Sequence, residues 1–211
     1  MKYIVDNKEF EVVIEKKNNK NTYVRIKDDL KIYVTTSKFT TQNEVKRILD
    51  NNYSFLSKMI ERKTLSNQRK EMFFYLGKTY DIFEVSIMDD IDIENDKIYT
   101  KNRTMLDRWY KKQIEKVFAQ RYELMCQIFD ENIIPPKLKI RTMKTRWGVY
   151  NKANHSITLN SHLIEYDIEK LDYVIIHELS HIIHFDHSKS FWQLVSKYCP
   201  NYKKIRKELK E

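Results

Sequence analysis

Glycine, proline and cysteine are all scarce in this chain of 211 residues, which contains 2 Gly, 3 Pro and 2 Cys. Few sharp turns are therefore marked in the sequence, so that Gly77 and Gly148 become informative positions. Cys126 and Cys199 stand alone, without a CxxC spacing. The sequence thus predicts neither a disulfide framework nor a zinc site built from cysteines.

Long apolar segments are also missing. No apolar run approaches the length that spans a membrane. The first ten residues, MKYIVDNKEF, become charged almost at once and lack the apolar core of a signal peptide. We therefore expect a cytoplasmic protein in a reducing compartment, with no membrane partner.

Positive charge predominates, since 39 Lys and Arg against 30 Asp and Glu give a formal net charge of +9. This excess fits an anionic partner such as a nucleotide or a nucleic acid. We favour a well-solvated surface instead, because lysines such as Lys16, Lys17 and Lys20 lie among asparagines in EKKNNKN. Hydrophobic residues at 41% and charged residues at 33% are ordinary for a globular protein of one or two domains.

Short β-type runs fill the first forty residues and predict a small antiparallel sheet. They are rich in β-branched and aromatic residues, and they occupy residues 3–5, 10–15, 22–26 and 30–36. A helical pattern follows from Thr41, where Glu44 three residues later completes a capping box. A second β-rich piece has Gly77 at an expected hairpin turn. We interpret residues 1–100 as a β-rich N-terminal module with one helix.

The remainder, residues 101–211, mixes helices and strands in an α+β fold. Periodicity and turn residues predict a helix, a strand, a strand–turn–strand unit, a helix and a short basic helix, at residues 104–129, 137–143, 146–160, 167–184 and after Pro200. The first of these helices has one apolar face, formed by Leu106, Tyr110, Ile114, Val117, Phe118, Met125 and Phe129.

The segment YVIIHELSHIIHFDHSKSFW, at residues 173–192, concentrates the histidines of the chain. His177-Glu178-Leu179-Ser180-His181 is an HExxH motif, and residues four apart on an α-helix share one face, so that two imidazoles can bind one cation. Glu178 lies near that cation without being forced to bind it, which is the place of a general base that takes a proton from water. Two core histidines with satisfied hydrogen bonds are the less favoured interpretation.

A catalytic zinc site needs a third protein ligand, and the nearby candidates are His184, Asp186 and His187. On a straight helix His184 lies about 10 Å beyond His177, too far for it to share the metal with both motif histidines. His187 can return to the metal if the helix ends near His184 and the chain reverses. Its spacing matches the metzincin pattern, in which a glycine holds the turn position of His184, and histidine tolerates left-handed backbone better than most residues. We favour His187.

Several stretches resemble the YgjP-like metal-dependent hydrolases, a zincin family related to the WLM and SprT-like peptidases. They are KTRWG, ITLNSHLI, LDYVIIHELSH, HFDHSKSFWQLV and PNYKKIRKEL, and FYLGKTYDI matches less specifically. The resemblance implies a zincin-like metallopeptidase core with an HExxH active-site helix, one Zn²⁺ per chain held by His177, His181 and His187, and Glu178 as the base. The chain departs from the family at Val149-Tyr150, where Ser-Cys usually follows Trp-Gly, and this difference bears on substrate specificity.

Four further residues are candidates for substrate contacts: Arg146, Trp147, Tyr150 and His162. Arg146 forms a basic edge with Arg141 and Lys144, and this edge can hold an anionic substrate or a peptide carboxylate, although a solvated edge is the commoner role. Arg146, Tyr150 and His162 are also the candidate oxyanion donors. Asn160 follows the second strand of its hairpin and is expected to border the cleft.

We therefore predict a zinc-dependent hydrolase that acts on a polypeptide, with Glu178 as general base on an activated water. Two alternatives stay open. The same chemistry would cleave a phosphoanhydride, and the basic edge fits a metal-dependent nucleotide hydrolase. A non-enzymatic, zinc-stabilised module that binds nucleic acid fits the net charge, but a structural site closes its fourth position with another ligand and leaves Glu178 without a role.

Overall fold

Two compact units, Met1–Met72 and Phe73–Glu211, make up the chain in the computed structural model. The structure describes residues 1–209, and at positions 70 and 71 it describes the backbone alone. Residues 73–100, which the sequence analysis places in the N-terminal module, pack with the second unit. The division into a β-rich module at residues 1–100 and a zincin-like catalytic domain at residues 101–211 stays a prediction, and residues 210 and 211 lie outside the described part.

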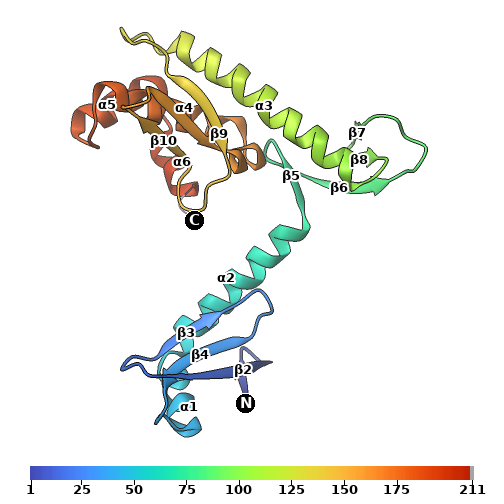
Figure 1. The fold of residues 1–211 in the computed structure, drawn as a ribbon, viewed down its shortest axis with the longest axis vertical. Coiled ribbons are helices and arrows are strands. Elements are labelled where there is room, and N and C mark those ends of the chain that lie inside the picture. The colour runs from blue at the N-terminus through green and yellow to red at the C-terminus, as the bar shows by residue number, and fades with distance from the viewer. Residues whose placement is uncertain (210–211) are drawn as a thin grey trace. The chain divides into compact units, whose positions relative to one another are not determined.

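The first unit contains a four-stranded sheet (Figure 1). Its strands lie in the order β1-β2-β4-β3, with bounds β1 Lys2–Val5, β2 Lys8–Lys17, β3 Tyr23–Ile26 and β4 Ile32–Ser37. The four strands are confirmed, but the prediction of a purely antiparallel sheet is wrong. β3 is at the edge of the sheet and pairs with β4 in antiparallel fashion. β4 lies between β3 and β2 and runs parallel to β2.

The helical segment after Thr41 consists of two helices, α1 (Gln42–Asn51) and α2 (Tyr53–Glu71). The predicted capping box is confirmed, since the Glu44 N–H donates to the Thr41 hydroxyl and the Thr41 N–H donates to the Glu44 carboxylate at 2.7 Å. The break between the helices falls at Asn52, whose φ of −115° and ψ of 21° leave the helical region. One continuous periodic pattern therefore spans two helices.

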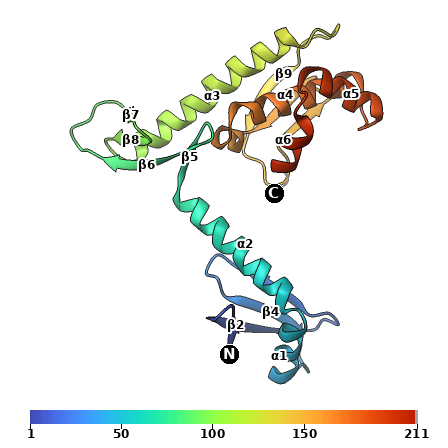
Figure 2. The same cartoon turned by 180° about the vertical axis from the view of Figure 1, so that it is seen from behind.

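The second unit is α+β, as predicted (Figures 1 and 2). One sheet has the order β5-β6-β8-β7. Its strands are β5 Phe73–Tyr75, β6 Lys78–Glu84, β7 Asp92–Glu94 and β8 Lys97–Thr100. The other sheet has the order β10-β11-β9. Its strands are β9 Lys137–Arg141, β10 Gly148–Asn151 and β11 Ser156–Asn160. The helices are α3 Arg103–Ile128, the 3₁₀ helix η1 Ser161–Glu165, α4 Ile168–Ile183, α5 Lys189–Tyr198 and α6 Tyr202–Glu208.

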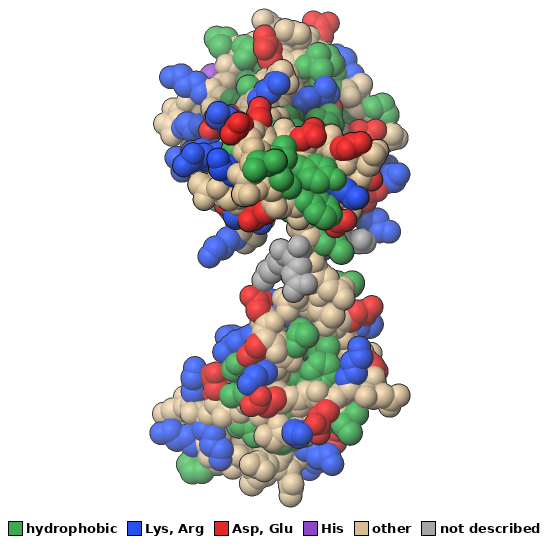
Figure 3. All heavy atoms as spheres, turned by 90° about the vertical axis from the view of Figure 1, so that its right-hand side faces the viewer, with side chains coloured by type: hydrophobic (Ala, Val, Ile, Leu, Met, Phe, Trp, Pro, Cys, Tyr) green, Lys and Arg blue, Asp and Glu red, His purple; other side chains and the backbone are tan. Residues whose placement is uncertain are grey.

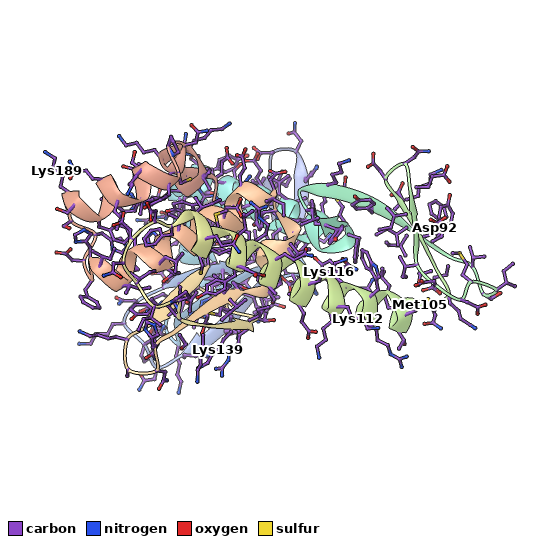
Figure 4. The ribbon with its side chains drawn as sticks, turned by 90° about the horizontal axis from the view of Figure 1, so that it is seen from above. Asp92, Met105, Lys112, Lys116, Lys139 and Lys189 are labelled. Carbon is purple, nitrogen blue, oxygen red and sulfur yellow. The ribbon has the colours of Figure 1, made fainter. Side chains whose placement is uncertain are left out.

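The helix that contains HExxH, α4, is the centre of the second unit, because it packs against α3, α5, α6, β10 and β11. The predicted apolar face of α3 is confirmed, since its residues from Tyr110 to Phe129 are buried in or packed against the same core, and Leu106 is buried outside that cluster. A two-pronged ion pair joins the two helices, with Arg121 donating to the Asp172 carboxylate at 2.8 and 2.5 Å. Lys112 and Lys116 project from the other side of α3 (Figure 4). This packing holds the site helix rigidly.

Charged side chains are mixed on the surface. On the face drawn in Figure 3, Lys and Arg lie interspersed with Asp and Glu, which favours the solvated-surface interpretation of the net charge. Within residues 1–209, no helix combines the length and the apolar content needed to cross a membrane.

The β5–β6 hairpin fixes the start of α4. Leu76 and Gly77 form its two-residue turn with φ values of 50° and 80°, as a type I′ turn requires. The Leu76 N–H donates to the Ile164 carbonyl at 2.8 Å. A Cβ on Gly77 would lie 1.9 Å from Oδ1 of Asp167, the residue before α4. The predicted hairpin turn at Gly77 is confirmed, and glycine is required there by both conformation and space.

Gly77→Ala is expected to lower the free energy of unfolding by about 1–2 kcal/mol, because alanine is strained in the left-handed region, and the contact with Asp167 adds to this loss. Urea unfolding of the variant measures the change, with the neighbouring exposed Lys78→Ala as control. Equal stabilities of the two variants would contradict the prediction.

Candidate active site

His177 and His181 lie one turn apart on α4, with ring centroids 4.9 Å apart. The helix ends at Ile183, and His184 follows it with a φ of −123° and a ψ of 108°. His184 is therefore in ordinary extended backbone, and the expectation of a left-handed residue at this turn is wrong. A histidine in place of the glycine of the metzincin pattern causes no backbone strain here.

The chain reverses after His184 and brings His187 back to the helix. Ser188 is the N-cap of α5, with its hydroxyl accepting from the Phe191 N–H, and this cap fixes the reversal. His187 Nε2 then lies 3.2 Å from His177 Nε2. One ligand atom from each of His177, His181 and His187 lies within 4.8 Å of the others. Among the described residues, these three histidines form the group of His, Cys, Asp or Glu side chains whose ligand atoms lie close enough to share a metal ion. Neither His184 nor Asp186 belongs to this group.

Burial disfavours the charged form of His177 and of His181, and metal ligands must be neutral imidazoles. Burial is the main cause that lowers the pKa of His177 to about 3, and the neighbouring charges of His181 and His187 lower it further. Burial also lowers the pKa of His181. The Nδ1 of His181 contacts the His184 carbonyl at 3.2 Å, and a proton on Nδ1 leaves the Nε2 lone pair free. The buried Nδ1 of His177 has no hydrogen-bond partner among the described residues.

This donor set fits a metal ion of the zinc type, which accepts three imidazole nitrogens. Two nitrogens on one zinc ion lie at most about 4.2 Å apart, so small side-chain rotations suffice to bring the three onto one centre. The buried ring of Phe191 packs against all three histidines and limits those rotations. Its centroid lies 4.9, 4.6 and 4.8 Å from the ring centroids of His177, His181 and His187. Trp192 stacks on His187 at 5.5 Å.

Glu178 is a buried carboxyl group beside these histidines, with 5% of its surface exposed. Burial raises its pKa to about 7, and a hydrogen bond from the backbone of Tyr150 and the charge of Arg146 oppose that rise. Its space depends on Gly148 in β10, because a Cβ there would lie 2.6 Å from Oε1 and 2.7 Å from Cγ of Glu178. The strand thus holds the carboxylate in place on α4.

A cavity of about 510 Å³ opens onto the three histidines and Glu178. Its walls come from α4, β10, the turn after β10, the loop after α4 and the C-terminal residues, and they consist of Arg146, Trp147, Gly148, Val149, Tyr150, Lys152, Tyr173, Val174, His177, Glu178, His181, Phe185, His187, Arg206 and Leu209. Three of the candidate substrate residues, Arg146, Trp147 and Tyr150, are therefore brought to it. His162, Arg141 and Lys144 do not line it.

The polar groups of two lining residues have partners in the protein. The Trp147 indole N–H donates to the Leu209 carbonyl at 2.8 Å and ties the C-terminal end to the start of β10. The Tyr150 hydroxyl lies 3.2 Å from His155 Nδ1. His162, on η1, has its Nδ1 2.5 Å from a Glu165 carboxylate oxygen. The roles of Tyr150 and His162 as oxyanion donors stay predictions, and His162 lies outside the cavity lining.

The side chain of Asn160 holds the backbone next to the cavity through hydrogen bonds. Its amide nitrogen donates to the carbonyls of Met143 and Arg146, each at 2.9 Å, and its oxygen accepts from the N–H of Met143 and of His162, each at 3.2 Å. The side chain is 4% exposed. Asn160 thus fixes the loop that precedes Trp147 and does not line the cleft itself.

Lys152 and Arg206 line the cavity but were not candidates in the sequence analysis. Lys152 lies in the β10–β11 turn, and Arg206 lies in α6. The sole signal for Arg206 was its place in PNYKKIRKEL, one of the stretches that carry the family resemblance. Their approach to the histidines depends on tertiary packing.

Comparisons with known proteins identify a family and two similar solved structures. A family model described as YgjP-like, metallopeptidase domain, matches residues 20–211. The metallopeptidase zymogen abylysin of Pyrococcus abyssi is 26% identical, with 46% of this chain and 90% of that chain covered and a TM-score of 0.37. The metallopeptidase zymogen jannalysin of Methanocaldococcus jannaschii is 23% identical, with 44% and 96% covered and a TM-score of 0.37. No curated protein matches the sequence.

Proposed function

Because the chain belongs to the YgjP-like family, through its metallopeptidase domain, we propose that it is a zinc-dependent peptidase in which His177, His181 and His187 hold one Zn²⁺. The family implies a metal. The observation that carries the proposal is the convergence of three imidazole nitrogens within 4.8 Å beside a buried carboxyl group. When bound, Zn²⁺ lowers the pKa of a water molecule and polarises the substrate carbonyl.

Glu178 is the general base in this proposal. It neighbours His177 in the chain, and its carboxylate is held by the Tyr150 backbone and by the space that Gly148 leaves. A carboxylate oxygen of Glu178 accepts a proton from the attacking water and later transfers it to the leaving amine. Burial of the group excludes bulk water from that transfer.

The free edge of β10 supports a polypeptide as substrate. β10 is at the edge of its sheet, and the Trp147 carbonyl accepts from the Asn160 N–H at 2.8 Å. Backbone groups alternate in direction along an antiparallel pair, so those of Gly148 and Tyr150 face away from β11. The Tyr150 N–H is engaged with Glu178. The Gly148 N–H and the two carbonyls are then free to pair with an extended peptide.

Nucleotide hydrolysis is the second candidate, favoured by the Arg and Lys side chains that line the cavity. The test is to incubate the zinc-loaded protein with libraries of uncharged peptides and unfolded proteins and, separately, with nucleoside triphosphates. We expect cleavage of the uncharged peptides to change little in Arg146→Ala, because main-chain pairing supplies their binding. Phosphates instead require charge-assisted donors, and the loss of one costs about 10–100-fold. Nucleotide turnover without peptide cleavage, lost in Arg146→Ala and Glu178→Gln, would overturn the proposal.

Gly148→Ala is expected to lower kcat by about 10- to 100-fold with zinc retained, because a new methyl group displaces the Glu178 carboxylate, and small displacements of a reacting group have large effects. The variant also loses stability, since the methyl group contacts Val174 at 2.8 Å. Turnover per zinc-loaded, folded molecule is the measurement. Thr158→Ala, on the partner strand and outside the cavity, is the control. A parental kcat in Gly148→Ala would contradict this role.

A further inference from the structure

Positive charge predominates inside the cavity. Arg146, Lys152 and Arg206 line it, and the acidic residue among its lining side chains is Glu178. The three cations come from three separate parts of the unit: the loop before β10, the turn after β10, and α6. Charges of one sign on the walls of a cleft concentrate ligands of the opposite sign. The cavity therefore selects for an anionic group near the histidines.

Among the side chains that the structure describes, neither Lys152 nor Arg206 has an ion-pair partner, and each cation lies against an aromatic ring. The Arg206 guanidinium lies 4.7 Å from the ring centre of Trp192, whose other contacts include the stacked His187. The Lys152 ammonium lies 4.3 Å from the ring centre of Phe185. A cation held by a ring keeps its N–H donors available for an anion.

Two other lysines of this unit, Lys170 and Lys204, have carboxylate partners within the protein, in contrast. Lys170 lies 3.0 Å from carboxylate oxygens of both Asp167 and Glu208. Lys204, also in α6, is 4.0 Å from Glu208. The Glu208 carboxylate is thus directed to Lys170 and Lys204, and Arg206 is left for a ligand.

We propose that Arg146, Lys152 and Arg206 form a carboxylate-binding subsite, which directs cleavage to peptides that carry an acidic side chain or a free C-terminus close to the scissile bond. This inference rests on the proposed peptidase function. The backbone edge of β10 lies in the same cavity wall as Arg146, so a strand-like peptide bound there brings its carboxylates to the cations. Peptides with lysine or arginine at these positions are repelled.

The test uses four fluorogenic peptides with one scissile bond, which combine Glu or Gln at a single position with a free or amidated C-terminus. We expect kcat/KM for a peptide with the recognised carboxylate to exceed that of its neutral partner by about tenfold at low salt, the lower end for a hydrogen bond to a charged group. The Glu–Gln pair reports a side-chain carboxylate, and the acid–amide pair reports the C-terminus. The preference shrinks at high salt, which screens exposed charges.

Arg206→Gln and Lys152→Gln are expected to lower this preference, the ratio of kcat/KM for the acidic peptide to that for its neutral partner, toward unity. Arg206→Lys keeps the charge and retains most of the preference. Lys207→Gln, which removes an exposed cation of α6 outside the cavity, is the matched control. Zinc content of each variant is measured alongside.

Binding supplies a readout that is independent of cleavage. Fluorescence anisotropy of the labelled peptides is measured with the full chain after zinc removal, when a carboxylate has no metal to bind. Tighter binding of the acidic peptide, lost in Arg206→Gln and kept in Lys207→Gln, supports the subsite even if no peptide is cleaved, which would refute the peptidase proposal alone. Equal affinity for acidic and neutral peptides overturns the subsite. Nucleoside triphosphates that bind and react when the acidic peptides do neither also overturn it.

Discussion

Glu178→Gln is expected to lower the rate of peptide hydrolysis by about 10²–10⁴-fold, the contribution of a positioned general base. The amide has nearly the shape of the carboxylate, and its oxygen can still accept from the Tyr150 backbone, but it cannot take a proton from water. Zinc content and melting temperature should therefore match the parent, because the histidine ligands and the core are unchanged. Turnover, zinc content and thermal unfolding are measured on the same preparation.

Glu169→Gln is the matched control, because it makes the same change in the first turn of the same helix and away from the cavity. It should keep parental turnover. If Glu178→Gln also kept full turnover on a substrate that the parent cleaves, Glu178 would not be the base. Loss of zinc or of stability in Glu178→Gln would show a structural role instead.

His187→Ala is expected to lose most of the bound metal, whereas His184→Ala retains it. His187 presents its Nε2 to His177 at 3.2 Å, while His184 contributes its backbone carbonyl, which an alanine also provides, to His181. Removal of an outer-shell partner lowers metal affinity by about 10–100-fold, and removal of a ligand should cost more. Competition with a zinc chelator measures both affinities.

Asp186→Ala extends this comparison to the other candidate near the turn. The Asp186 carboxylate hydrogen-bonds to Ser188, which lowers its pKa, and it lies outside the histidine group. We expect its variant to bind zinc as the parent does. Equal losses of zinc in the variants of His184 and His187 would contradict the assignment of His187 as the third ligand.

Local chemistry made many elements predictable. The capping box at Thr41 and Glu44, the apolar face of α3 and the turn at Gly77 each depend on residues within a few positions of one another. Where the pattern was wrong about the sheet, a non-local contact decided, because β4 inserts beside β2 and runs parallel to it. The break at Asn52, whose side-chain amide donates to the Ile48 carbonyl, interrupts one periodic run. Strand order of this kind depends on pairing partners far away in the sequence.

The sequence by itself determined that His177 and His181 face one way with Glu178 between them, because an α-helix places residues four apart on one side. The sequence also favoured His187 as the third ligand and named Arg146, Trp147 and Tyr150, but the tertiary structure decided which of the candidate residues meet. It brought His187 back through the Ser188 cap, put Gly148 against Glu178, and turned Lys152 and Arg206 into the cavity from the β10–β11 turn and from α6. The helical repeat is a property of a few adjacent residues, whereas these approaches require the second unit to have closed its core around α4.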